Sequence, residues 1–355
     1  MFAMSTDLTC GTCRTLQEAF LSKRMLVFTD HQMSFYCLSA SWTEGLGNPD
    51  PNAARLVDKN HRPTHLLRSL VHLTSSHWNW RLVVEILETY SIRLITKEAD
   101  TLDAFLGVMN HIRRSQPGTQ FLRGLPLIKY IGNTSKVVPA DYFNSFEELV
   151  AAALSWHSYR HAFSSHQRRS KFPSWTWAGW SGGASFWFLG FQEVKHRSVL
   201  RHARLESSSG QVVVSSTLYN NNIQDVLDTV MLIQFEAPMI PAASFSTDDS
   251  YDANEFRVSG RESFLKMNPD NYTPNRLIEN VRRGIWSCFM LLSDGRRDEI
   301  GEDGSYSIFV LVICWEADQL TAERIGSFSI SSSASKDARL GLIQESWTWR
   351  RVRLI

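Results

Sequence analysis

The sequence predicts an α+β protein, with its helices concentrated before residue 171 and its strands after it. Three observations support this class. Apolar residues recur at the three- and four-residue spacing of a buried helix face in several segments between residues 80 and 161. After Trp180, segments rich in β-branched and aromatic residues follow one another. The chain has 355 residues, 43% of them hydrophobic, which allows a large core. Changes in composition and hydrophobic pattern along the chain predict three regions, residues 1–45, 46–171 and 172–355.

The first region is expected to form one helix followed by a hairpin. The segment "TLQEAFLSK" has its apolar residues at helical spacing, and Thr15 with Glu18 matches a capping box at the start of the helix. The segments "RMLVFT" and "QMSFYC" flank the dipeptide "DH", as the two strands of a short hairpin do. A lone helix on a hairpin is a poor beginning for an α/β unit.

The second region begins with a loop rich in Gly, Pro and Asn and continues with three predicted helices. "WRLVVEILETY" and "DTLDAFLGVMNHI" each carry an apolar stripe. In the second of these helices the stripe is expected to include Leu106, and Asp100 is expected to be the N-cap. Ser145 and Glu148 match a capping box for the third helix, which is expected to continue through "SWHSYRH" to His161.

The third region is expected to be built from strands. In the last one, alternate residues fall on one face because alternate residues of a strand point the same way, and these are Trp347, Trp349, Arg351, Arg353 and Ile355. Residues 241–256 and 331–337 have the composition of exposed loops. The predicted strands are "QVVVSS", "VMLIQFEA", "YSIFVLVICW", "AERIGSFSIS" and "WTWRRVRLI".

The stretch "FPSWTWAGWSGG" joins the helical and the strand-rich regions. Trp175 and Trp177 are expected to lie on one face of a short extended segment, which Pro173 begins and Gly179 ends. Such indoles either bind a flat ligand or bury a large area against both regions. Since conspicuous aromatic residues most often pack, the prediction is burial in a core.

Composition excludes several classes of function. The 37 basic and 36 acidic residues give a net charge of +1, which argues against binding to nucleic acid or to a membrane surface through bulk charge. The longest apolar run, residues 307–315, is too short to span a bilayer. The first residues do not read as a secretory signal, and five cysteines are few for a disulfide-stabilised protein. A cytoplasmic location is therefore expected.

No catalytic or metal-binding pattern stands out. "CGTC", from Cys10 to Cys13, lacks the preceding strand of a redox motif and the second pair of ligands of a zinc site. His157 and His161 are spaced like two ligands on a helix, but Ser158 stands where a zinc protease has Glu, so a packed His157 is expected. No phosphate-binding loop, dinucleotide fingerprint or nucleophile elbow occurs. No metal site and no cofactor are predicted.

Several segments together resemble the heterokaryon-incompatibility (HET) family of filamentous fungi. The first region is similar to the end of the HET domain, where Trp-Thr-Leu-Gln-Glu precedes a Leu-Ser-Arg stretch and an "F-T-x-x-Q-x-x-F-x-C" hairpin. "ETYSIRLITKEADTLDAFLGV", which contains Arg93 and Asp100, is similar to the family's next segment. Trp175, Trp177 and Trp180 lie in a stretch similar to its Pro-Ser-Trp-x-Trp-Ala motif. The last two strands also resemble the ends of such proteins. The matching residues of the first region are Thr15, Leu16, Gln17, Glu18, Leu21, Ser22, Arg24, Phe28, Thr29, Gln32, Phe35 and Cys37.

The resemblance implies a role in fungal non-self recognition and regulated cell death, carried out through association with protein partners. Two strings of the family's α/β portion, "LSYxWG" and "W-I-D-x-x-C-I-N-Q", do not occur here, and Arg14 stands where the family has Trp. The first region is therefore interpreted as the C-terminal remnant of a truncated α/β HET domain. Without the partner strands, Leu16, Phe20 and Leu26 are expected to be exposed. The chain as it stands is expected not to be an enzyme.

A second hypothesis follows from the likeness of HET domains to TIR domains, some of which cleave NAD. By that analogy Glu18 is the catalytic carboxylate and stabilises the ribosyl oxocarbenium as nicotinamide leaves. NAD is then a substrate, not a cofactor, and the missing half of the domain has to be supplied by a partner chain or by an upstream exon. Without that half, Glu18 only pairs with Thr15 in the capping box. A third hypothesis is an inactive, degenerate paralogue.

Overall fold

The structure is a computed structural model that divides into two compact units. The first comprises Met1–Thr119 and Ile131–Ala140, and the second comprises Gln120–Tyr130 and Asp141–Ile355. The described residues are 3–4, 20–28, 33–37, 41–44, 80–93, 95, 97–115, 119–128, 145–159, 167–186, 196–214, 223–246, 255–258, 261–267, 273–294, 305–333 and 347–355.

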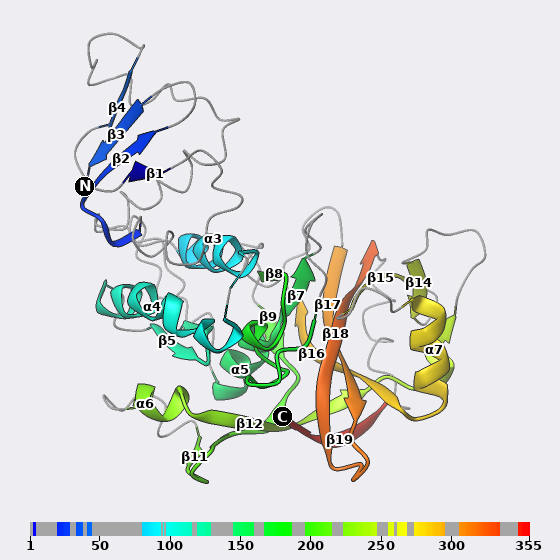
Figure 1. The fold of residues 1–355 in the computed structure, drawn as a ribbon. Helices are drawn as coiled ribbons and strands as arrows, with labels where there is room; N and C mark the ends of the chain where they lie inside the picture. Colours follow the sequence, from blue (N-terminus) through cyan, green and yellow to red (C-terminus); the bar gives the residue numbers. More distant parts are fainter. Residues whose placement is uncertain are drawn as a thin grey trace. The chain divides into compact units, whose positions relative to one another are not determined.

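A small sheet of four strands belongs to the first unit (Figure 1). The predicted hairpin is confirmed, because β2 and β3 pair antiparallel with Arg24 opposite Cys37. The strands pair in the order β1 (Ala3–Met4), β2 (Arg24–Phe28), β3 (Met33–Cys37) and β4 (Ser41–Thr43).

Only the end of the predicted first helix falls within the described residues, and the expectation of exposed apolar residues on the helix and hairpin is wrong for Phe20, although Leu21 and Phe28 are 43% and 45% exposed. Phe20 is 6% exposed, and its ring lies 5.5 Å from the ring of His111 in an edge-to-face contact. Leu26 is half-buried. Residues of the later helix α4 (Asp103–Ser115) in the same unit supply a surface against which Phe20 packs. Leu16 lies outside the described residues.

Two predicted helices are present, α3 (Trp80–Ser91) and α4 (Asp103–Ser115). Tyr90 of α3 is fully buried, its ring lies 4.5 Å from that of Phe105, and its hydroxyl donates to the carbonyl of Thr101 at 2.7 Å. The N-cap prediction is wrong: Asp100 is exposed and ends the 3-10 turn η2 (Glu98–Asp100), three residues before α4 begins. Leu106 is 43% exposed, because the buried stripe of α4 follows Phe105, Val108, Met109 and Ile112 instead.

A sheet of eleven strands dominates the second unit, so the α+β class is confirmed. The main path runs β11-β10-β12-β16-β17-β18-β15-β14-β13, while β9 pairs with β16 and β19 pairs with both β12 and β18. The bounds are β9 (His196–Ser198), β10 (Arg201–Ser207), β11 (Val212–Val213), β12 (Val230–Met239), β13 (Phe245–Ser246), β14 (Glu255–Val258), β15 (Arg261–Met267), β16 (Trp286–Asp294), β17 (Ser305–Trp315), β18 (Thr321–Ser333) and β19 (Thr348–Leu354).

Strand β19 closes part of this sheet. The ladders from β12 through β16, β17 and β18 reach β19, and β19 returns to β12 with seven residue pairs. Strand β17 lies in the middle of the sheet's main path and is buried on both faces, which accounts for its continuous apolar sequence. Its even-numbered residues, such as Val310, pack in a core with α7 (Pro274–Arg282), and its odd-numbered residues, such as Phe309 and Leu311, are equally buried on the other side.

The third predicted helix, α5 (Phe146–Leu154), is shorter than expected. The predicted N-cap is confirmed, because the Ser145 hydroxyl accepts the main-chain N–H of Glu148 at 3.1 Å, which is one of the two hydrogen bonds of a capping box. At Ser155 the chain leaves the helix, and the hydroxyl donates back to the carbonyl of Ala151 at 2.6 Å. The next residues form β7 (Trp156–Tyr159), which pairs antiparallel with β8 (Gly183–Phe186). The predicted continuation of the helix through His157 is therefore wrong.

The remaining elements of the second unit complete its core. The hairpin of β5 (Thr119–Leu122) and β6 (Leu125–Ile128) precedes α5, and the short helix α6 (Ile223–Leu227) precedes β12. The predicted exposed loop at 241–256 is wrong at its apolar positions, since Phe245 and Phe256 are 2% and 1% exposed and stack on each other. Among the described residues, no helix is both long and apolar enough to cross a membrane.

Candidate functional site

The tryptophan loop, residues 167–186, does not form the extended segment that was predicted. Trp177–Gly179 form the 3-10 turn η3, whose N-cap Thr176 accepts the main-chain N–H of Ala178 on its hydroxyl at 3.2 Å. The N–H of Gly179 donates to the carbonyl of Thr176 at 3.1 Å. These local hydrogen bonds replace the ladder that an extended segment would need, and they point the indoles in different directions.

The prediction that the indoles pack is confirmed. Trp175, Trp177 and Trp180 are 0%, 2% and 5% exposed. Each indole N–H reaches a main-chain carbonyl: Trp175 that of Met231 at 3.4 Å, Trp177 that of Gly124 at 3.0 Å, and Trp180 that of Ser174 at 2.7 Å. A buried indole needs such an acceptor. The three residues therefore tie the loop to β12, to the β5–β6 turn and to itself.

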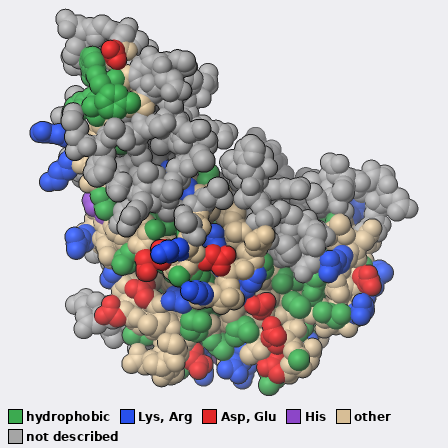
Figure 2. Space-filling view, in the orientation of Figure 1, with side chains coloured by type: hydrophobic (Ala, Val, Ile, Leu, Met, Phe, Trp, Pro, Cys, Tyr) green, Lys and Arg blue, Asp and Glu red, His purple; other side chains and the backbone are tan. Residues whose placement is uncertain are grey.

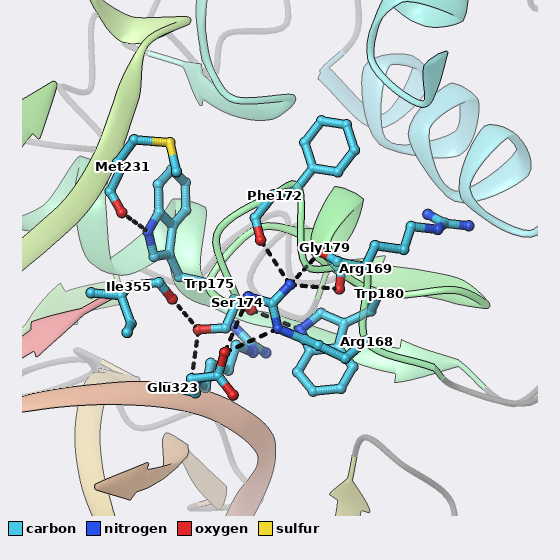
Figure 3. Close-up of polar contacts among 11 residues, drawn as sticks. Arg168, Arg169, Phe172, Ser174, Trp175, Gly179, Trp180, Met231, Glu323 and Ile355 are labelled. Carbon is cyan, nitrogen blue, oxygen red and sulfur yellow. Dashed lines mark hydrogen bonds and ion pairs between the residues drawn. The ribbon is translucent and has the colours of Figure 1, made fainter. Parts of the chain in front are cut away.

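Arg168 links separate parts of the loop to one another and to Glu323 (Figure 3). Its Nη1 donates to the carbonyls of Phe172 at 2.7 Å and Gly179 at 3.2 Å, while its Nε and Nη2 both donate to one carboxylate oxygen of Glu323 at 3.2 Å. The guanidinium also lies 5.6 Å from the centre of the Trp180 ring. In the sequence this residue belongs to the short basic run "HQRRSK", where it has the pattern of a surface charge.

A buried cation lies at the C-terminal end of α5. Arg324 is fully buried, its guanidinium lies 3.8 Å from the Trp156 ring centre, and its Nη1 donates to the carbonyl of Leu154 at 2.6 Å. Nη2 donates to the carbonyl of Trp156. Burial lowers the pKa of Arg324 well below its ordinary value, because desolvation disfavours the charged form. The negative end of the helix dipole acts in the opposite direction and stabilises the cation.

His157 packs beside this cation. It is 3% exposed, its ring lies 4.9 Å from that of Phe309, and its Nδ1 is 2.9 Å from the hydroxyl of Ser327. The expected packed histidine is thus confirmed, on a strand instead of a helix. His161, its predicted neighbour on that helix, lies outside the described residues.

The other predicted residues are placed as follows. Glu18, Cys10 and Cys13 lie outside the described residues. Arg93 is 7% exposed just after α3, where its N–H donates to the carbonyl of Tyr90 at 3.1 Å. Arg93 and the exposed Asp100 belong to the first unit, whereas the three tryptophans belong to the second. Across the part of the chain that the structure describes, no three His, Cys, Asp or Glu side chains come together in a way that could hold a metal.

A groove of about 500 Å³ lies against the tryptophan loop. Its lining is largely apolar and carries the carboxylate of Glu206, with the Arg168–Glu323 ion pair at one side. A volume of this size is typical of sites that receive a small ligand or a few side chains. The apolar lining comes from Phe172, Pro173, Met231, Leu232 and Ile355.

Next to the groove, the outer face of β10, β12 and β19 carries four arginines. Register places Arg201, Glu236 and Arg351 in one row across the three strands, and Arg204, Gln234 and Arg353 in the next row. The row after that contains Glu206 and Leu232, which line the groove. We call Arg201, Arg204, Arg351 and Arg353, together with Trp349, the arginine face. The prediction that Trp349, Arg351 and Arg353 share one side of their strand is confirmed. Trp347, predicted for the same face, instead precedes β19, is 5% exposed and packs in the core with α7.

Two contacts order the arginine face. Arg351 donates to the carboxylate of Glu236 at 2.9 Å, and the Arg201 guanidinium lies 3.7 Å from the Trp349 ring centre. Trp349 itself is 37% exposed. Elsewhere, on the face of the molecule that Figure 2 presents, basic and acidic side chains are interspersed with apolar ones. The sequence indicated the β19 half of this face, but not Arg201 and Arg204, whose three-residue spacing puts them on opposite sides of a regular strand.

Comparison of the chain with known protein families, with curated proteins and with solved structures found no match.

Proposed function

We propose that this chain is a HET-family protein of fungal non-self recognition, which acts in heterokaryon incompatibility and regulated cell death by associating with a protein partner. The family assignment is supported by the order of its motifs, from the Thr15–Glu18 segment through Arg93 and Asp100 to the tryptophan loop. The mode of action is supported by one observation on the molecule, the arginine face.

The arginine face has the residue types that dominate protein interfaces. Tryptophan and arginine are enriched among the residues whose truncation weakens a complex most. Here an exposed Trp349 is stacked by Arg201, and three further arginines follow in the register of the same strands. Stacking reduces the rotamer freedom of both side chains before a partner arrives, which lowers the entropic cost of association.

The catalytic alternative requires Glu18 to act on NAD. The buried tryptophans and the Arg168 guanidinium hold the second unit together, so we assign them to packing and not to catalysis. Support for the catalytic alternative therefore rests on the TIR analogy alone. The inactive paralogue is the remaining alternative. Both are separated from the proposal by one experiment.

The experiment is induced expression in a filamentous fungal host, scoring growth arrest, dye uptake and total NAD for the natural chain, Glu18→Gln and an empty vector. Glu148→Gln is the matched control, because Glu148 is likewise the third residue after a capping Ser or Thr. The expected result is cell death with the natural chain and with both variants, at the NAD level of the empty vector. Absence of death with the natural chain contradicts the proposal in favour of an inactive paralogue. Death with NAD loss that Glu18→Gln alone abolishes replaces the proposal by the catalytic alternative.

A further inference from the structure

We propose that the arginine face and the adjoining groove form one docking surface for an acidic, extended segment of a partner protein. In that segment two acidic residues separated by one residue bind the arginine rows, and an apolar residue two positions further enters the groove. The inference rests on the proposed association with a protein and specifies the chemistry of the partner.

A β-bulge creates the arginine face. Arg201 lies opposite Glu236 and Arg204 opposite Gln234, so β10 uses three steps where β12 uses two. The extra residue leaves His202 with a left-handed φ of 55°. Because side chains alternate along a regular strand, Arg201 and Arg204 would otherwise point to opposite faces. The bulge aims both at the outer face, beside Arg351 and Arg353.

The charge of the two arginine rows calls for an anionic occupant. Four guanidinium groups share these rows with one carboxylate, that of Glu236, which Arg351 already binds, while the carboxylate of Asp318 outside the rows attracts Arg353. Arg204 is exposed, its guanidinium makes no hydrogen bond or ion pair within the described residues, and its neighbour across the ladder is the neutral Gln234. The planar fork of a guanidinium matches the two oxygens of a carboxylate, which favours Asp or Glu as its partner.

The spacing of the rows fits an extended peptide. Successive rows on one face of a sheet are roughly 7 Å apart, which is also the distance between alternate residues of an extended chain. A segment that lies along the strands therefore meets one row with every second residue. Its first two such residues face arginines, whereas the third faces Glu206 and Leu232 at the groove. Glu206 repels an acidic side chain there, and the apolar lining favours a large apolar one.

A polynucleotide fits the same surface poorly. Glu236 and Glu206 lie within the track of any backbone that follows the rows. Arg201 already stacks on the ring of Trp349, so a base would have to compete with this guanidinium for that face of the ring. The net charge of the chain is only +1, which gives little long-range attraction for a polyanion.

The test measures binding of fluorescein-labelled nine-residue peptides to the full chain by anisotropy. The first peptide carries Glu at its third and fifth positions, Leu at its seventh and valine between them. A second peptide has Glu in place of Leu, a third has Lys in place of both Glu residues, and a single-stranded oligothymidine is included. We expect the first peptide to bind at least about tenfold more tightly than the other probes.

Variants locate the binding. Arg204→Gln and Arg351→Gln are each expected to weaken binding of the first peptide about fivefold, and the double variant by more than tenfold. Arg282→Gln is the matched control, since Arg282 is an exposed arginine on α7 outside this face. Far-ultraviolet circular dichroism verifies that the exposed substitutions leave the fold intact. Equal weakening by Arg282→Gln overturns the proposal, as does oligothymidine binding that is as tight as peptide binding.

Failure of this inference is distinguishable from failure of the proposed function. In the fungal host, the Arg204→Gln, Arg351→Gln double variant is expected to lose cell death while Arg282→Gln retains it. Cell death by the double variant, together with no preference for the first peptide, contradicts the acidic segment but leaves the proposed function in place. Peptide binding without any cell death in the host contradicts the proposed function and leaves the docking surface in place.

Discussion

Replacing Gly179 by alanine should destabilise the second unit strongly, because the added methyl group would meet main-chain atoms. Gly179 ends the 3-10 turn in the tryptophan loop, where a Cβ would meet the main chain of Pro173. It would overlap the carbonyl oxygen of Pro173 and lie 3.1 Å from its carbonyl carbon and 3.2 Å from the Nη1 of Arg168. Main-chain atoms cannot rotate away as a flexible side chain can.

The expected loss of stability can be worked out from the steric overlap and from the hydrogen bonds of Gly179. Overpacking a closed interior typically costs 1–3 kcal/mol, here about 3 kcal/mol because the obstacle is main chain. If the loop shifts to relieve it, the carbonyl of Gly179 moves from the N–H of Arg169, now 2.7 Å away, and from the Arg168 guanidinium. Each such hydrogen bond contributes about 1 kcal/mol. Gly179→Ala is therefore expected to lower the free energy of unfolding by about 3 kcal/mol if the loop stays in place, or by about 2 kcal/mol if the loop shifts and loses both hydrogen bonds.

The assay is urea unfolding followed by tryptophan fluorescence, with Gly210→Ala as the matched control. Gly210 has a φ of 78° and no atom near its missing Cβ, so alanine there meets backbone strain alone, about 1 kcal/mol. The natural chain and Gly210→Ala should have similar midpoints, and that of Gly179→Ala should be far lower. A loss for Gly179→Ala no greater than for Gly210→Ala would refute the close approach of Gly179 and Pro173.

Three further predictions concern the same unit. Arg324→Met removes the donor to two buried carbonyls at the end of α5 and also removes a desolvated charge. We expect a net loss of about 2–4 kcal/mol in the free energy of unfolding, measured in urea. An unchanged midpoint would contradict the buried contacts. Ser145→Ala should cost about 1 kcal/mol, whereas Ser145→Asp should restore most of it, as measured by thermal unfolding. The main-chain N–H groups of Thr321 and Leu320 lower the pKa of Asp318 in the folded state. The stability that this carboxylate confers is therefore present above its unfolded-state pKa and is lost as the pH falls through its lower folded-state pKa. Asp318→Asn should therefore flatten the fall of the urea midpoint below about pH 4, and an identical fall in both proteins would refute this contribution.

Local signals in the sequence were sufficient for several elements of the fold. The helices α3 and α4 and the start of α5 follow from apolar spacing and from the Ser145 cap, whose energetics involve only neighbouring residues. The long strand β17 follows from an apolar run that only two-sided burial explains. The burial of the tryptophans follows from their size, which makes exposure costly wherever they lie.

The errors came where distant residues decide the local conformation. The segment around His157 continues the helical pattern of α5, yet it forms a strand because β8, almost thirty residues later, pairs with it. Its main chain is also fixed by Arg324, whose guanidinium binds the carbonyls on either side of Ser155. A pattern confined to fifteen residues contains neither partner.

The arginine face could likewise be predicted from the sequence only in part. Alternation in β19 predicted that Trp349, Arg351 and Arg353 share a side, because that rule needs only one strand. Arg201 and Arg204 violate the rule and still join them, since the bulge at His202 adds one residue to β10. A bulge is specified by the pairing of two strands, and here the partner strand begins more than twenty residues later. The arginine face therefore depends on an irregularity in strand pairing, the β-bulge of β10. Removing this bulge is the most direct way to test the arrangement of the four arginines separately from their charge.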